Sequence, residues 1–282
     1  MFRRYDDDGY PRRRLLNGRV IIALAVAGFA VVSYFFSTDK NPITGENQRV
    51  AMTADQEIAL GLHAAPQMIA QFGGEYRSAG LQKELDAIGA ELLAALKTDL
   101  DAKGRSIPYP FEFHLLADDR TVNAFALPGG QVFVTHALFK ELKSHAQLAG
   151  VVGHEIGHVL ARHSAQQMAK QQLTQGLAGA AGVAAGTYDA ARMAQLVANL
   201  ANMKFSRNDE LEADQWGVRL MGMAHYDPRA MIEVMQILER VGGGAGEPEF
   251  LSTHPKPGNR VEYIKQIIAD VYPSGVPEGM RR

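Results

Sequence analysis

The middle of the chain contains the pattern H-E-x-x-H within the stretch Val151-Val152-Gly153-His154-Glu155-Ile156-Gly157-His158-Val159-Leu160. On a helix of about 3.6 residues per turn, His154 and His158 are offset by only about 40° and project from one face, one turn apart. Two imidazoles so placed can bind one metal ion. Glu155, about 100° round the helix, can reach a water on that metal without being a ligand. The stretch therefore predicts a helix that carries part of a catalytic metal site.

The composition is that of an ordinary globular protein, with 46% hydrophobic and 21% charged residues among 282. A net charge of −2 gives no overall electrostatic attraction for nucleic acid, so we expect no nucleic-acid partner. The chain has no cysteine, which excludes disulfides, thiolate zinc sites and a catalytic thiol. His, Glu and Asp are thus the only strong zinc ligands that the sequence offers.

The N-terminal part of the sequence is typical of a membrane anchor. Residues 1–19 are rich in arginine and lack apolar periodicity, so we expect a cytoplasmic basic arm. Residues 20–36 form an uncharged run of 17, at the short end of what crosses a hydrocarbon core about 30 Å thick. Because basic residues stay on the cytoplasmic side, everything after Ser37 is expected across the membrane. A cleaved signal peptide and a buried core helix are the alternatives, although no good cleavage site follows the run.

We expect a linker at 37–52, a zinc metallopeptidase domain at 53–273 and a tail at 274–282 to follow. Apolar spacing and capping residues predict helices at 53–71, 81–96, 146–172, 189–203, 207–223, 227–240 and 259–271. Two strands, at 111–116 and 131–134, are expected to pair with each other. The predicted fold class is therefore α+β and mostly helical, with a small antiparallel sheet.

The segment 176–186 consists almost entirely of Gly, Ala, Leu and Val. Its eleven residues are too few to span a membrane. We expect a close-packed or mobile segment, with a second membrane contact as the alternative.

A tetrahedral catalytic site needs a third protein ligand and leaves its fourth position to water. His163 would lie about 180° round a continuous helix from His154, so we expect it to face away from the metal. Glu210 and Asp214 share the four-residue offset of the two histidines and would lie on one helical face, with Glu212 opposite. Glu210 is the better candidate ligand, and Asp214 could orient a ligating imidazole. By spacing alone, the two acidic residues could also form a solvated helix face.

Four separated motifs occur in consistent order. They are N-A-F-A-L-P-G-G at 123–130, V-V-G-H-E-I-G-H-V at 151–159, S-R-N-D-E-L-E-A-D at 206–214, and T-H-P at 253–255 followed by Arg260. Together they resemble the CAAX-prenyl-protease-like family of zinc metallopeptidases, over about residues 41–265. The N-P-I-T-G motif at 41–45 is similar to the branch that contains bacterial periplasmic quality-control proteases and the mitochondrial inner-membrane stress protease.

This resemblance implies a zincin-like catalytic domain with one Zn²⁺ per chain. It implies that His154, His158 and Glu210 are the metal ligands and that Asp214 orients one of them. Glu155 would then act as the general base of the catalysed reaction.

The resemblance also implies that the N-A-F-A-L-P-G-G turn and the strand after it border the active-site cleft. The candidate substrate-binding residues are Asn123, Ala124, Phe125, Gly129, Gly130, Val132 and Arg260. A strand edge at Gln131–Val134 could pair with an extended substrate, and an ordinary hairpin turn is the alternative. His254 is expected near the metal as a catalytic residue, either donating to the oxyanion or capping the zinc, unless it is merely a loop residue. Arg260 could steady either the scissile carbonyl or the fold.

These features predict a membrane-anchored zinc metalloendopeptidase in which Glu155 activates a zinc-bound water. By family and topology, its expected location is the bacterial inner membrane, as a single-pass protein with the domain on the periplasmic side. Unfolded or misassembled envelope proteins are the expected substrates. The alternative is a non-proteolytic, chaperone-like binding module with His254 capping the zinc, against which the presence of Glu155 argues. With no tetratricopeptide repeats and no lipid-modified cysteine, neither repeat-mediated partner binding nor lipid attachment is expected.

Overall fold

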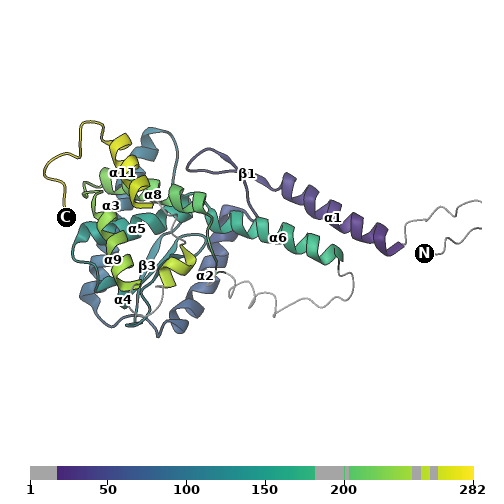
Figure 1. Ribbon diagram of the computed structural model, residues 1–282, viewed down its shortest axis with the longest axis horizontal. Helices are drawn as coiled ribbons and strands as arrows, with labels where there is room; N and C mark the ends of the chain where they lie inside the picture. The colour runs from purple at the N-terminus through teal and green to yellow at the C-terminus, as the bar shows by residue number, and fades with distance from the viewer. Residues whose placement is uncertain (1–17, 182–199, 201–202, 243–248, 255–259) are drawn as a thin grey trace, which may run out of the picture.

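The computed structural model describes residues 18–181, 200, 203–242, 249–254 and 260–282. Most of these residues form one body, from which helices α1 (Gly18–Phe36) and α6 (His163–Ala181) project side by side (Figure 1). The predicted helix at 189–203 and most of the Gly/Ala-rich segment 176–186 lie outside the described residues.

Helix α1 covers the predicted anchor at 20–36 and leaves large apolar side chains exposed, among them Phe29 and Phe36. Within the described part of the chain, however, no helix has both the length and the apolar character that a membrane crossing requires. The helix is thus confirmed, and the crossing stays a prediction.

The predicted linker 37–52 is folded onto the body as an antiparallel hairpin of β1 (Thr38–Lys40) and β2 (Asn47–Arg49). The Asn41 side chain donates a hydrogen bond to the Leu160 carbonyl at 2.8 Å, and Gln48 donates to the Ala161 carbonyl at 3.1 Å. The last carbonyls of a helix have no partner within that helix. The hairpin therefore caps the C-terminal end of the helix that bears H-E-x-x-H.

Helix α2 (Ala54–Gln71) begins where the sequence predicts, with Thr53 and Gln56 forming a capping box. It is followed by α3 (Ala79–Ala102), a longer helix than the one predicted at 81–96. After the sheet, the short helix α4 (His136–Phe139) leads to α5 (His145–Leu160), which is capped by Ser144.

The central sheet has three strands, β3 (Glu112–Leu116), β4 (Ala124–Ala126) and β5 (Gln131–Thr135), in the order β3-β5-β4. The two predicted strands do pair, but they run parallel, so the prediction of an antiparallel sheet is wrong for this pair. The prediction that Gln131–Val134 forms a sheet edge is also wrong. The three-residue strand β4 returns antiparallel onto β5 through the Pro128-Gly129-Gly130 turn and makes β5 the central strand.

Both faces of the sheet are buried. Leu115 and Val134 belong to the larger core, which includes residues of α3, α5 and α8. Their neighbours Leu116 and Phe133 point to the opposite face and pack in a second core with residues of α2. The sheet thus lies between α2 and the helices that carry H-E-x-x-H and the predicted third ligand.

The predicted helix 146–172 is not continuous, because α5 ends at Leu160 and α6 starts at His163. Arg162 between them has a φ of 58°, the left-handed conformation that ends a helix. Its side chain is buried and donates hydrogen bonds to Glu57 at 2.7 Å and to Asp39 at 2.8 Å. Two carboxylates, one of them buried, thus hold a non-glycine residue in this conformation.

The C-terminal half consists of α8 (Arg207–Met223), α9 (Ala230–Gly242), α10 (Glu249–Thr253) and α11 (Arg260–Val271). Helices α8 and α11 confirm the predictions at 207–223 and 259–271. Helix α9 starts at Ala230, later than the predicted first residue Pro228. Asp227, which was predicted as the cap, accepts hydrogen bonds from the backbone and side chain of Arg229.

Glycines allow α5 and α8 to pack very closely. A Cβ atom placed on Gly153 would lie 3.3 Å from the Cα of Gly217. On Gly157 it would lie 3.0 Å from the Ala213 carbonyl oxygen and 2.8 Å from the Trp216 Cβ. This close contact brings the acidic residues of α8 to the two histidines of α5.

Candidate metal centre

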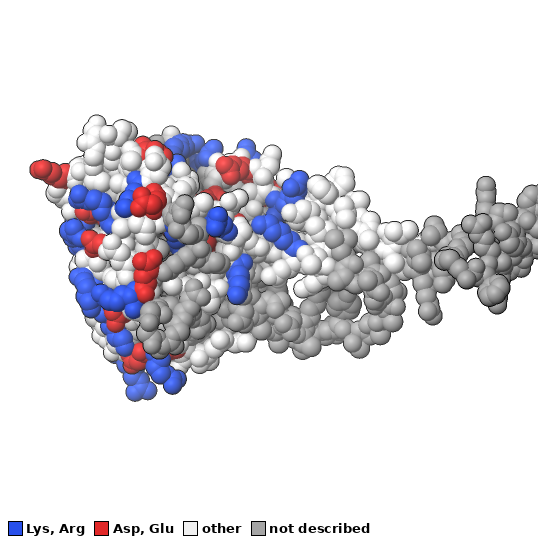
Figure 2. Space-filling view, viewed as in Figure 1, with Lys and Arg blue, Asp and Glu red and all other residues white. Residues whose placement is uncertain are grey.

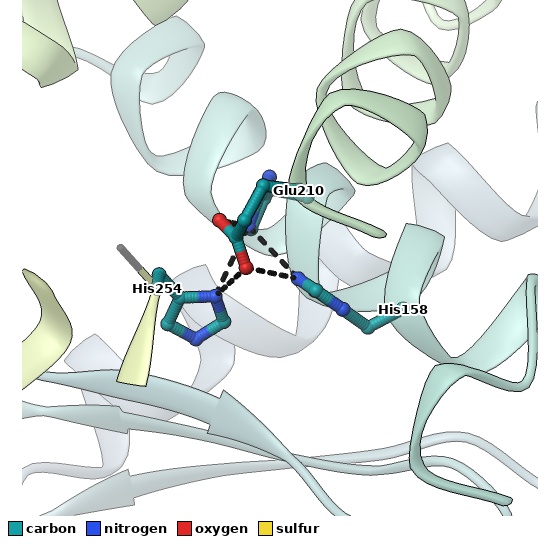
Figure 3. A group of neighbouring side chains, drawn as sticks. His158, Glu210 and His254 are labelled. Carbon is teal, nitrogen blue, oxygen red and sulfur yellow. Dashed lines mark hydrogen bonds and ion pairs between the residues drawn. The ribbon is translucent and has the colours of Figure 1, made fainter. Parts of the chain in front are cut away.

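Four buried side chains converge on one point: His154 and His158 from α5, Glu210 from α8, and His254 directly after α10. One donor atom from each lies within 4.8 Å of every other. Figure 3 shows His158 and His254 pointing toward the Glu210 carboxylate. The structure thus brings together four residues that the sequence singled out, although they come from three parts of the chain.

The spacing of the donor atoms fits one zinc ion. Tetrahedral ligands at about 2.0–2.1 Å from zinc lie about 3.3 Å from each other. Here the Nε2 atoms of His154 and His158 are 3.1 Å apart, and they lie 3.6 and 3.5 Å from the two Glu210 oxygens. Nδ1 of His254 lies 3.4 Å from His154 Nε2 and 3.0 Å from Glu210 Oε1. The geometry thus accommodates two imidazoles and a carboxylate, with His254 as a possible fourth donor.

The hydrogen bonding of the cluster is incomplete, as expected of groups that bind a metal. Glu210 Oε2 accepts no hydrogen bond from any described residue, although Arg260 Nη1 lies 3.0 Å away. Burial alone would raise the pKa of Glu210, but the surrounding histidines outweigh it and hold the pKa well below its usual value. Glu210 is therefore a carboxylate, the form that binds zinc.

Asp214 lies behind His154, as predicted from the sequence. Its Oδ1 is 3.0 Å from His154 Nδ1, the ring nitrogen that faces away from the cluster. Arg260, at the start of α11, donates to both Asp214 oxygens, at 2.7 and 2.8 Å. Burial opposes ionisation of Asp214, but Arg260 and His154 hold the pKa of Asp214 below its usual value. A fixed carboxylate in this position orients a metal-binding imidazole.

Glu155 is fully buried beside the cluster, with its Oε1 3.7 Å from His254 Nε2. Neither carboxylate oxygen has a hydrogen-bond partner among the described residues. Burial raises the pKa of Glu155 above its usual value, against the opposing effect of His254 and His154. This carboxylate is thus available to exchange a proton near the cluster.

The predicted substrate-binding residues are mostly buried. The side chains of Asn123, Ala124 and Val132 are at most 3% exposed. Phe125 is half-buried and stacks on Phe133 with ring centroids 4.8 Å apart. Contact between these residues and a substrate would therefore use the backbone rather than the side chains.

The other predicted substrate-binding residues, Gly129, Gly130 and Arg260, pack against the rest of the protein. Gly129 and Gly130 have φ values of 83° and 109°, and a Cβ on Gly129 would lie 2.4 Å from the Cα of Ile58. Arg260 is buried against Asp214 and Glu210, so it supports the cluster directly.

His163 is not part of the cluster, in agreement with the expectation that it does not bind the metal, and it is buried. Its contact with His158 was not predicted, since it was expected to face away, but its Nδ1 lies 2.9 Å from Nδ1 of His158. The helix break at Arg162 causes the difference, because a continuous helix would carry His163 to the far side. Neither glycine nor proline marks this break in the sequence.

Comparison with known proteins agrees with this geometry. Residues 81–268 match the model of peptidase family M48. The chain is 31% identical over 251 residues to the β-barrel assembly-enhancing protease of Escherichia coli, covering 86% of this chain and 50% of that protein. It is 31% identical over 256 residues to the mitochondrial metalloendopeptidase OMA1 of Danio rerio, covering 85% and 52%. A third relative, the mitochondrial metalloendopeptidase OMA1 of Schizosaccharomyces pombe, is 29% identical, with 92% and 75% covered.

The chain spans about half the length of the first two of these relatives. Their names fit the predicted bacterial and mitochondrial branch. The CAAX-prenyl-protease-like name is corrected, because it belongs to a different branch. The family model matches more than half of the chain, and the cluster supplies the donors that a zinc enzyme needs. On these grounds the chain belongs to peptidase family M48.

Proposed function

We propose that this protein is a membrane-anchored endopeptidase that cleaves unfolded or misassembled envelope proteins. The single observation that carries the proposal is the buried cluster of His154, His158 and Glu210 with the Glu155 carboxylate beside it, which accepts no hydrogen bond from any described residue. A purely structural metal site needs ligands, but it does not need a buried base without a hydrogen-bond partner.

In the proposed mechanism, His154, His158 and Glu210 hold the zinc. When bound, zinc lowers the pKa of a coordinated water to about 7 and polarises the scissile carbonyl. Glu155 accepts the proton from the attacking water and passes it to the leaving amine. Burial raises the pKa of Glu155, which favours the protonated form that the second transfer needs. Asp214 and Arg260 keep the ring of His154 in place throughout.

His254 has two possible roles, and they use different nitrogens. Nδ1 faces Glu210 and the cluster, which is the position of a capping ligand. Nε2 faces Glu155, from which position it could donate to an oxyanion at the reacting carbonyl. We infer that His254 caps the cluster in the conformation described here, since its Nδ1 lies at ligand spacing from two other donors. His254 would then have to leave the fourth position before a water could bind there for the proposed reaction.

An extended substrate main chain would pair with β4, and not with β5 as the sequence suggested. Strand β4 is at the edge of the sheet, and its only ladder among the described strands is with β5. Main-chain pairing gives affinity with little side-chain selectivity, which suits unfolded substrates of varied sequence. The names of the relatives, a β-barrel assembly-enhancing protease among them, support a role in the cell envelope.

Attachment to a membrane by α1 is proposed from three observations. The sequence has an arginine-rich arm before α1, and the helix carries exposed apolar side chains such as Leu24 and Phe29. In Figure 2 the charged side chains gather over the body, whereas the described part of the projecting helices is largely uncharged on this face. An exposed apolar surface of this kind marks a site of interaction with a membrane or a partner. The basic arm next to it favours a membrane, because basic residues typically flank a membrane segment on its cytoplasmic side.

The topology can be tested with a reporter enzyme fused after Arg282 that is active only outside the cytoplasm. We expect reporter activity in the membrane fraction of a bacterial host. An inactive reporter, or a fusion found wholly in the soluble fraction, would refute the anchor.

The proteolytic function is tested with the Glu155→Gln variant and an unfolded protein such as casein. We expect the zinc-loaded wild type to cleave casein and the variant to be slower by about 10²–10⁴-fold, because the general base is lost. Its zinc content should be unchanged, since Glu155 is not a proposed ligand. Zinc-saturated wild type that binds casein without cleaving it would instead favour the chaperone-like module.

A further inference from the structure

The ring of His158 is contacted from behind by a second histidine. Nε2 of His158 faces the metal cluster, and its Nδ1 lies 2.9 Å from Nδ1 of His163. Nε2 of His163 in turn lies 3.3 Å from Oε2 of Glu212. His158 and His163 are both buried, whereas the Glu212 side chain is 37% exposed. The three side chains therefore form a chain of contacts from the cluster to the surface, through α5, α6 and α8.

The positions of the hydrogens follow from these partners. A neutral imidazole that binds a metal through Nε2 carries its hydrogen on Nδ1. The His158 Nδ1–H can then donate only to an unprotonated Nδ1 of His163. That leaves the hydrogen of a neutral His163 on Nε2, where the Glu212 carboxylate accepts it. One arrangement of hydrogens therefore satisfies every contact in the chain.

We propose that His163 is a positioning residue for His158 and that Glu212 sets the tautomer of His163. The proposal rests on the proposed role of His158 as a metal ligand. His163 holds the His158 ring in the orientation and tautomer that present Nε2 to the metal, which strengthens metal binding. His154 receives the same support from Asp214, so each imidazole has its own outer partner.

The local backbone is built to place His163. The left-handed conformation of Arg162 turns the chain between α5 and α6, and Glu57 and Asp39 hold the Arg162 side chain. Phe205 packs on the His158 ring with centroids 4.1 Å apart. The ring thus lies against Phe205 and has its Nδ1 directed at His163.

Zinc affinity of the purified full chain, measured by competition with a chelator, tests the proposal. We expect His163→Leu to raise the zinc Kd by about 10–100-fold, the usual effect of losing such a partner. His163→Gln, whose amide oxygen can still accept from His158, should recover most of that loss. The matched control is His145→Leu. His145 is the first residue of α5, as His163 is of α6, and it also pairs with a glutamate, Glu84, at 3.2 Å, but it is not part of the cluster. Its zinc Kd should equal that of the wild type.

A reference variant separates this inference from the ligand assignment. If His158→Ala binds zinc as tightly as the wild type, His158 is not a ligand and the proposed site is wrong. If His158→Ala loses zinc while His163→Leu keeps the wild-type Kd, the positioning role of His163 alone is refuted.

A second measurement uses the wild-type protein and so does not depend on the folding of a variant. Nitrogen NMR of the zinc-loaded wild type with ¹⁵N-labelled histidine reports which ring nitrogens carry hydrogen. We expect His163 to be protonated on Nε2 and bare on Nδ1, with a hydrogen on Nδ1 of His158. A hydrogen on Nδ1 of His163 would overturn the proposal.

Discussion

The pKa of His154 is set by opposing effects of its surroundings. Burial and the neighbouring Arg260 lower the pKa of His154, but hydrogen bonds to Asp214 and Glu210 outweigh them and raise it to about 9. The metal-free protein therefore holds a proton on His154 at neutral pH. A zinc ligand must be a neutral imidazole, so this proton has to leave when the metal binds.

The affinity of the site for zinc should therefore fall as the pH is lowered. Below about pH 9 the proton on His154 competes with zinc, so the apparent affinity should fall by up to about tenfold for each pH unit of acidification. Titration calorimetry near pH 7, in buffers with different ionisation enthalpies, should show release of about one proton from this group. A zinc affinity that does not change between about pH 7 and about pH 8.5 would contradict the prediction.

Individual site residues could be placed from the sequence where they repeat at helical spacing. The offsets of His154 and His158, and of Glu210 and Asp214, each place two side chains on one face of a helix, and the structure has both pairs facing the cluster. That the two pairs meet came from the family resemblance and not from spacing. His163 could not be placed, because its position depends on a left-handed residue that is neither glycine nor asparagine.

Between elements, the contact that matters most for the site is that of α5 with α8. We predict that Gly157→Ala lowers the free energy of unfolding by about 1–3 kcal/mol, because the new methyl group would overlap α8. The overlap is with the Ala213 carbonyl oxygen at 3.0 Å and the Trp216 Cβ at 2.8 Å. Zinc affinity should fall as well, since Glu210 lies on the displaced helix.

The measurement is denaturant unfolding of the metal-free variant, followed by chelator competition for zinc. Gly80→Ala is the matched control. Gly80 is also in a helix, α3, but a Cβ there would meet only Ser78 Oγ, at an ordinary 3.9 Å. The control should be neutral or slightly stabilising. Equal stability of the two variants would show that α5 and α8 tolerate separation.

Helices whose first turn is capped by a recognisable residue could be predicted from the sequence. Helix α2 starts after the Thr53 capping box, from which its start was predicted, and α8 starts after Ser206 at the predicted residue 207. Strand β4 was missed, because its three small and aromatic residues give no periodic signal. The direction of β3 relative to β5 depends on β4, so the sheet type could not be read from the sequence either.

The residues between α1 and the body of the molecule also contact the helix that carries the two histidines. The hairpin β1–β2 caps the end of α5, and Asp39 within it holds Arg162 at the turn before His163. The proposed membrane anchor is therefore joined directly to the C-terminal end of the helix that carries both histidines. No periodic pattern in 37–52 indicated this, because its contacts are hydrogen bonds to residues more than a hundred positions away.

We propose that residues from two helices far apart in sequence hold one zinc ion. The most direct test is a crystal of the zinc-loaded full chain measured by anomalous scattering at the zinc absorption edge. We predict one anomalous peak, within about 2.0–2.2 Å of His154 Nε2, His158 Nε2 and a Glu210 oxygen. A peak that lies elsewhere, or one that Glu210 does not reach, would contradict this assignment of the zinc ligands.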